Sequence, residues 1–139
     1  MRAVLDTNVV VSGLIWRNTP RLILDAARDR RITLCTSSVL LAELADVLGR
    51  SHLAAAIAAS RTSPEFLMQR YALLAQRVVP AEIEPTVIAD PDDDAVLACA
   101  LAAQVDLVVS GDPHLLNLKH FQRIPIITPA EALERIPVN

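Results

Sequence analysis

Short runs rich in Val, Ile and Leu alternate along this chain with longer stretches of helical period, and this alternation restricts the possible folds. The apolar runs predict strands at residues 2–5, 32–36, 105–110 and 125–127, with a weaker candidate at 86–89. The helical stretches predict helices at residues 9–15, 20–30, 38–49, 52–59, 63–77, 91–103 and 129–135. Apolar strands that alternate with helices are typical of a parallel sheet covered on both faces. We therefore expect a three-layer α/β/α domain with a mostly parallel central sheet.

Residues 50–80 depart from this alternation, because two predicted helices follow one another there without a strand between them. Ser51, Thr62, Ser63 and Pro64 supply the helix-start signals. A helical pair inserted in an α/β domain serves as a lid, a clamp or a dimer surface, and the sequence leaves these three roles open. A length of 139 residues fits one domain, so we expect a single unit over residues 1–139 with this insertion.

The composition indicates which environments suit the chain. The formal net charge is −3, which excludes a strongly basic surface but not a local basic patch. No apolar run approaches the ~18 residues of a membrane-spanning helix, and the first residues lack a signal-peptide pattern. Cys35 and Cys99 lie in apolar contexts without metal-ligand spacing, as expected for reduced core cysteines. We therefore expect a cytoplasmic protein without a membrane segment.

Aspartates follow two of the predicted strands, at the point where each strand ends. Asp6 interrupts the apolar run "VLDTNVVV" directly after the strand at 2–5, and Asp112 follows the strand at 105–110 across a single glycine. Ligands of open parallel sheets collect beyond the carboxyl ends of the strands. Burying a carboxylate costs several kcal/mol unless something pairs with it. We therefore expect both aspartates at one edge of the sheet, together with a counter-charge.

A glutamate and an aspartate from two predicted helices extend this acidic group. Glu43 lies about one turn into the helix at 38–49, at the margin of its apolar stripe and near the same sheet edge. In "ADPDDDAVLACALA", Asp90 is the expected N-cap, and Asp92 and Asp93 complement the positive end of the helix. Asp94 instead aligns with the apolar positions three, four and seven residues later. We therefore expect Asp94 to point inward.

Four converging carboxylates without a nearby lysine need a cation. Such a group repels itself by several kcal/mol unless it is protonated or neutralised. Hard divalent cations with oxygen ligands, Mg²⁺ or Mn²⁺ above all, are the natural counter-charge. Such ions activate water and stabilise an in-line displacement at phosphorus. The expected site comprises Asp6, Glu43, Asp94 and Asp112.

The stretches "LDTNVVVSGL", "SSVLLAEL", "DDDAVLACALA" and "LVVSGDPHLL" together resemble the four acidic motifs of PIN domains, in matching order. The resemblance covers nearly the whole chain and is strongest to the VapC-like toxin components of bacterial toxin–antitoxin systems. It implies a PIN-like fold, Mg²⁺- or Mn²⁺-dependent ribonuclease activity on RNA, a homodimer and a cognate antitoxin protein as partner.

The resemblance also assigns roles to individual residues. It implies that Asp6, Glu43, Asp94 and Asp112 are the catalytic and metal-binding acids, with Asp92 as the fallback for Asp94. The side chains that match supporting positions, which would orient the ligands, are Thr7, Asn8, Ser38 and Ser110. Arg17 and Arg21 belong to a group of arginines that could form a local RNA-binding patch.

Other α/β folds also place acids at a sheet edge, and two of them do not fit this sequence. A response-regulator receiver needs a lysine after a late strand, and Lys119 does not follow one. A haloacid-dehalogenase-type phosphatase needs Asp-x-Asp after its first strand, where this chain has Asn8 in the second position. Two alternatives stay open: a PIN-fold module that binds RNA or protein without cutting, and a DNA-directed structure-specific nuclease.

Overall fold

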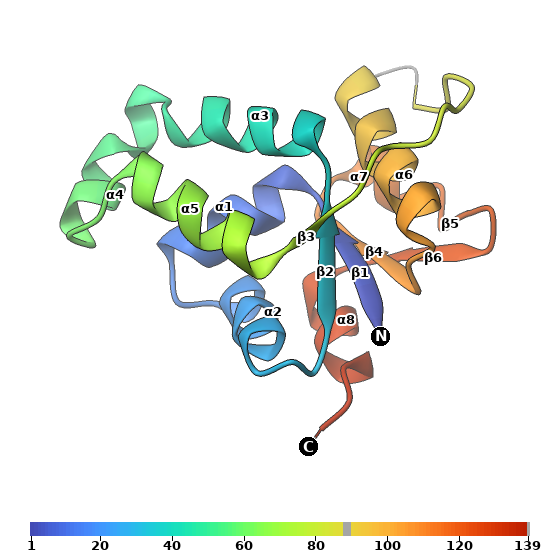
Figure 1. Cartoon of the computed structure of the whole chain (residues 1–139), viewed down its shortest axis with the longest axis horizontal. Helices are drawn as coiled ribbons and strands as arrows, with labels where there is room; N and C mark the ends of the chain where they lie inside the picture. The colour runs from blue at the N-terminus through green and yellow to red at the C-terminus, as the bar shows by residue number, and fades with distance from the viewer. Residues whose placement is uncertain (88–89, 139) are drawn as a thin grey trace.

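A computed structural model describes residues 1–87 and 90–138 of the chain (Figure 1). Its centre is a six-stranded sheet in the order β3-β2-β1-β4-β6-β5. The strands are β1 (Arg2–Leu5), β2 (Thr33–Thr36), β3 (Gln76–Arg77), β4 (Leu107–Val109), β5 (His120–Phe121) and β6 (Ile124–Ile127). All neighbouring pairs are parallel except the short edge strand β5, which runs antiparallel to β6. The expectation of a mostly parallel sheet is confirmed.

The helices connect the strands and cover both faces of the sheet. They are α1 (Thr7–Ile15), α2 (Thr19–Arg28), α3 (Ser38–Leu48), α4 (Ala54–Ala59), α5 (Pro64–Leu74), α6 (Pro91–Ala103), α7 (Pro113–Leu116) and α8 (Pro129–Arg135). A single 3-10 turn, Ser51–Leu53, precedes α4. Helices α4 and α5 form the expected inserted pair and extend away from the sheet on one side (Figure 1).

Alternate residues of the central strands point to two separate hydrophobic clusters, as the pleat of a strand requires. Ala3 and Leu5 of β1 belong to a cluster with residues of α1, α2, α3, α5 and α8. Val4, between them, belongs to a second cluster that contains residues of α6 and α7. The sheet therefore lies between two helical layers, which confirms the α/β/α architecture.

Three short elements were not expected from the sequence. The predicted helix at 63–77 ends at Leu74, because Gln76 and Arg77 pair with Cys35 and Thr36 as the edge strand β3. The other two are β5 and α7. Thr86 and Val87 are not in a strand, and residues 88–89 of the weak strand candidate lie outside the described residues.

Side-chain caps fix the starts of most helices, and they set the position of the polar edge of the sheet. The residues that accept a hydrogen bond from an amide in the first turn of a helix are Asp6, Asn18, Ser37, Ser63, Asp90, Asp112 and Thr128. Asp6, Asp90 and Asp112 begin helices that leave the same edge of the sheet. Figure 1 shows α3 and α6 beginning near the upper ends of the central strands, opposite the two chain termini.

Among the described residues, neither a disulfide bond nor a membrane-spanning helix contributes to this fold. Cys35 and Cys99 are buried and free. Within residues 1–87 and 90–138, no helix combines the length and the hydrophobicity needed to span a bilayer.

Candidate functional site

Asp6 lies where β1 passes into α1, at the carboxyl edge of the sheet. Its amide donates to the carbonyl of Val109 at 3.0 Å, which joins the ends of β1 and β4. Its Oδ1 accepts from the amide of Val9 at 3.0 Å and so caps α1. Because the strand end and the helix start both constrain it, this buried carboxylate has a fixed position.

Ser110 connects Asp6 to the second aspartate of this edge. The buried Ser110 hydroxyl donates to Asp6 Oδ2 and accepts from the amide of Asp112 at 2.9 Å. Asp112 in turn caps α7, since its Oδ1 accepts from the amide of His114 at 2.9 Å. The loop after β4 thus holds Asp112 beside Asp6, as expected for residues that follow neighbouring parallel strands.

The start of α6 brings two further aspartates to the same place. Asp90 Oδ1 accepts from the amide of Asp92 at 3.1 Å and caps the helix. Asp93, in the first turn, is only 7% exposed. Asp90, Asp93 and Asp112 each offer a carboxylate oxygen, and these oxygens lie within 4.8 Å of one another. Such spacing is what three oxygen ligands of one cation require.

Glu43 of α3 completes an acidic pocket at this edge. The residues that line the pocket are Asp6, Thr7, Asn8, Glu43, Asp90, Asp92, Asp93, Val96 and Asp112. No lysine, arginine or histidine is among these lining residues. The ion pairs found in the described part of the chain involve Arg28 and Arg50, and none of them reaches the pocket.

Burial and neighbouring carboxylates disfavour the ionised forms of three of these acids, namely Asp6, Glu43 and Asp93. Burial raises the pKa of Asp6, although the hydrogen bonds from Ser110 and Val9 oppose the rise. Burial also raises the pKa of Glu43, against the influence of the nearby Thr7 hydroxyl. Burial, together with Asp112, Asp90 and Asp6, raises the pKa of Asp93 to about 8. The pocket therefore stabilises added positive charge, whether a proton or a metal ion.

Two buried oxygens of the pocket favour a metal ion over a proton as the bound positive charge. Asp93 Oδ2 and Thr7 Oγ1 are buried and have no hydrogen-bond partner among the described residues. Leaving such groups unpaired costs free energy that a ligand can recover. The donor set consists of carboxylate and hydroxyl oxygens without sulfur or imidazole, which suits Mg²⁺ or Mn²⁺ and not a soft metal. The residues present therefore fit a hard divalent cation.

The structure brings together most of the residues that the sequence placed at the site. Asp6, Glu43 and Asp112 line one pocket, with Thr7, Asn8 and Asp92 beside them, and Ser110 lies directly behind two of the acids. Ser38 is exposed at the start of α3 and does not line the pocket, whereas Ser37 is buried and caps that helix.

Asp94 does not point into the pocket, and this expectation was wrong. Its carboxylate accepts hydrogen bonds from the amides of Thr86 and Val87, the latter at 2.8 Å. Asp93 occupies the inward position instead, three, four and seven residues before the buried Val96, Leu97 and Ala100. Residues 95–103 are almost uniformly apolar, so their pattern does not indicate which side of α6 is buried.

Asp90 and Asp93 are the pocket residues that the sequence reasoning missed. The sequence predicts Asp90 as the helix cap and Asp93 as a complement to the helix dipole, and Asp90 does cap α6. A cap at the carboxyl edge of the sheet can also face a ligand, so the capping role does not exclude a place in the site. The sequence holds no signal that separates Asp93 from Asp94, because Asp94 aligns equally well with the apolar Leu97, Ala98 and Leu101.

The two arginines expected to contact RNA lie at the far end of α1. The guanidinium of Arg21 donates to the carbonyls of Gly13 and Leu14, the latter at 2.9 Å. It therefore satisfies the carboxyl end of α1, whereas the pocket lies at the amino end of that helix. A helix of nine residues is about 13 Å long. Arg17 follows the same end of α1 and is exposed.

The fold and the pocket define a class of protein, namely an α/β/α domain that gathers carboxylates at the carboxyl edge of a parallel sheet. The family model described as "PIN domain" matches residues 2–114. The chain belongs to the PIN domain family, as its acidic motifs suggested.

One solved structure similar to this chain is the crystal structure of VapBC2 from Rickettsia felis, bound to a DNA fragment from the VapBC2 promoter. The similarity covers 92% of this chain and 98% of that chain, with a TM-score of 0.56 and 16% sequence identity. At that identity the likeness establishes a shared fold. No curated protein matched the sequence.

Proposed function

We propose that this PIN domain is a Mg²⁺- or Mn²⁺-dependent endoribonuclease that hydrolyses RNA phosphodiester bonds. The observation that carries the proposal is the pocket lined by six carboxylates and, among the described residues, by no basic side chain. In this pocket Asp93 Oδ2 is buried with no hydrogen-bond partner in the described part of the chain. A uniformly acidic pocket repels a polyanion such as RNA, so a cation is needed before the substrate can approach.

Five of the six acidic side chains have a proposed task that follows from their position. Asp90, Asp93 and Asp112 would hold the ion with Asp6 beside them, and Ser110 orients both Asp6 and Asp112. Glu43 faces the group from α3, where its raised pKa suits it to accept a proton from an attacking water. When bound, the cation would supply activation of that water and neutralisation of charge at phosphorus. The expected products carry a 5′-phosphate and a 3′-hydroxyl.

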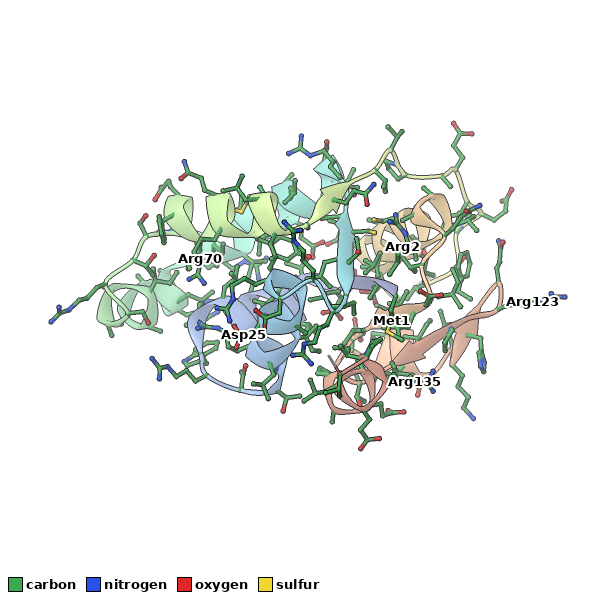
Figure 2. All side chains as sticks on the ribbon, turned by 60° about the horizontal axis from the view of Figure 1, so that its bottom comes forward. Met1, Arg2, Asp25, Arg70, Arg123 and Arg135 are labelled. Atoms are coloured by element: carbon green, nitrogen blue, oxygen red, sulfur yellow. The ribbon has the colours of Figure 1, made fainter. Side chains whose placement is uncertain are left out.

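We further propose that the protein is the toxin of a toxin–antitoxin pair, with an antitoxin protein as partner and a homodimer as its assembly. The similarity to the Rickettsia felis VapBC2 assembly supports this idea. A groove between α2 and α5 also supports a protein partner, since Leu14, Leu24, Leu73 and Leu74 line it. Asp25 and Arg70 belong to the same lining, from α2 and α5 respectively (Figure 2). Because RNA is the proposed substrate, we propose that the protein acts in the cytoplasm.

The test is cleavage of a mixed RNA pool by the purified protein with Mg²⁺ or Mn²⁺, and with EDTA as control. We expect cleavage with metal, none with EDTA, and none by Asp6→Asn or Asp93→Asn. Asp46→Asn is the matched control, because Asp46 is an exposed acid on α3 that pairs with Arg50 and does not line the pocket. This variant should cut RNA at the rate of the unchanged protein.

When structured DNA is tested alongside the RNA pool, other outcomes contradict the proposal in distinct ways. Cleavage of structured DNA but not RNA would identify a DNA-directed nuclease. Metal-independent RNA binding without cleavage of RNA or DNA would identify a binding module. Undiminished cleavage by Asp6→Asn and Asp93→Asn would show that another site is responsible.

A further inference from the structure

The carboxylate of Asp94 faces away from the pocket and holds the backbone that leads into α6. Its Oδ1 accepts from the amide of Val87 at 2.8 Å and from that of Thr86 at 3.3 Å, and its Oδ2 lies 3.2 Å from the Thr86 amide. Val87 is buried in the hydrophobic cluster around α6. A carboxylate that accepts several amide hydrogen bonds is a strong local anchor.

Further hydrogen bonds continue from this anchor to the acids of the pocket. The amide of Asp90 donates to the carbonyl of Val87 at 3.3 Å, and the amide of Asp93 donates to the carbonyl of Asp90 at 3.0 Å. Asp94 is therefore linked through Val87 to the backbone of Asp90, whose carboxylate lies within the 4.8 Å group. These hydrogen bonds form a closed ring that joins Asp94, Val87, Asp90 and Asp93.

We propose that Asp94 is a positioning residue for the acidic pocket, which sets the place of Asp90 by anchoring residues 86–87 to the first turn of α6. The proposal rests on the proposed metal-dependent function. It assigns Asp94 no contact with the ion, because both of its oxygens are directed to the amides of Thr86 and Val87.

An asparagine at this position separates anchoring from metal ligation. The single carbonyl oxygen of Asn can accept from both amides, as Oδ1 of Asp94 does, although its NH₂ group would meet the Thr86 amide as a second donor. An alanine accepts from neither amide. If Asp94 anchors the segment, Asp94→Asn preserves most of the effect and Asp94→Ala loses it.

The first experiment measures Mn²⁺ binding by calorimetry for the unchanged protein, Asp94→Asn, Asp94→Ala and the control Asp46→Asn. Loss of a residue that orients ligands weakens metal affinity by roughly 10- to 100-fold. We expect about a tenfold weaker affinity for Asp94→Ala, and a change below about threefold for Asp94→Asn and Asp46→Asn. Circular dichroism and urea unfolding establish that each variant is folded.

The second experiment follows the amide resonances of Asp90 and Asp93 by NMR in metal-free protein, together with their hydrogen exchange. We expect shifted resonances and faster exchange in Asp94→Ala, and near-unchanged values in Asp94→Asn. This readout depends on the anchor alone and does not require that the pocket bind metal.

The outcomes separate failure of the anchor from failure of the proposed function. Unchanged Mn²⁺ affinity and unchanged Asp90 resonances in Asp94→Ala would overturn the anchor while leaving metal binding intact. A loss in Asp94→Asn as complete as in Asp93→Asn would overturn it by showing that Asp94 is itself a ligand. If the unchanged protein bound no Mn²⁺ while Asp94→Ala displaced Asp90, the anchor would stand and the nuclease proposal would fall.

Discussion

Asp93 combines burial with three acidic neighbours, and both features favour a bound positive charge at this side chain. Its pKa is raised to about 8 by burial first and then by Asp112, Asp90 and Asp6. One of its oxygens has no hydrogen-bond partner among the described residues. In the absence of metal, a proton is therefore the counter-charge available to this side chain.

The raised pKa of Asp93 predicts how the stability of the metal-free protein depends on pH. Between about pH 4 and about pH 8 the folded state binds this proton and the unfolded state does not. The unfolding free energy should therefore fall as the pH rises through this range. Asparagine cannot titrate, so Asp93→Asn should show a shallower fall. Urea unfolding in EDTA at pH 5, 6, 7 and 8 measures both slopes, and identical slopes would contradict the prediction.

The bounds of α6 could be predicted from the sequence, whereas the rotation of this helix about its own axis could not. Its bounds were predicted correctly, because the Asp-Pro pair supplies a cap and a first helical residue. The rotation of the helix was predicted wrongly by one residue, because both sides of its apolar run are hydrophobic. The end of α5 was also misjudged, since pairing of β3 with β2 overrides helical preference there.

The close approach of α1 and α2 gives a prediction at the scale of elements. A Cβ atom on Gly13 would lie 2.9 Å from Leu24 Cδ1 and 3.0 Å from the carbonyl carbon of Pro20. Overpacking of this kind costs about 1–3 kcal/mol and outweighs the helix-propensity gain of Ala over Gly, which is about 1 kcal/mol. Gly13→Ala should therefore lower the unfolding free energy by up to about 2 kcal/mol in urea denaturation.

Gly111 provides the matched control for Gly13. An added Cβ there meets nothing within 4 Å, so Gly111→Ala should change the unfolding free energy by less than about 0.5 kcal/mol. If Gly13→Ala lowered the unfolding free energy no more than Gly111→Ala does, the packing of α1 on α2 would be looser than described.

The architecture of the whole molecule could be predicted from the sequence, because local alternation and strand-end acids both follow from a parallel sheet. Asp6 and Asp112 were placed correctly at one edge, since neighbouring parallel strands end together. The completion of the pocket by Asp90 and Asp93 could not be predicted, because it depends on how α6 is rotated against the sheet. Short elements such as β3 and α7 are fixed by tertiary contacts and leave little local signal.

Metal binding at the pocket should stabilise the entire domain. A ligand that binds only the folded state at a hundredfold excess over its Kd adds about 2.7 kcal/mol to the unfolding free energy. We therefore expect Mg²⁺ or Mn²⁺ to raise the Tm of the protein, and EDTA to reverse the effect. Asp6→Asn and Asp93→Asn should show a much smaller rise, whereas NaCl at matched ionic strength should produce none. An equal rise in all three proteins would indicate binding outside the pocket.

Anomalous scattering from a crystal of this protein soaked in Mn²⁺ shows directly whether the pocket holds a metal ion. Carboxylate oxygens of Asp90, Asp93 and Asp112 already lie within 4.8 Å of one another. We expect an anomalous peak between these side chains and Asp6, and we expect no such peak in crystals of Asp93→Asn. A soaked crystal with no peak in the pocket, or with its strongest peak elsewhere on the domain, would contradict this expectation.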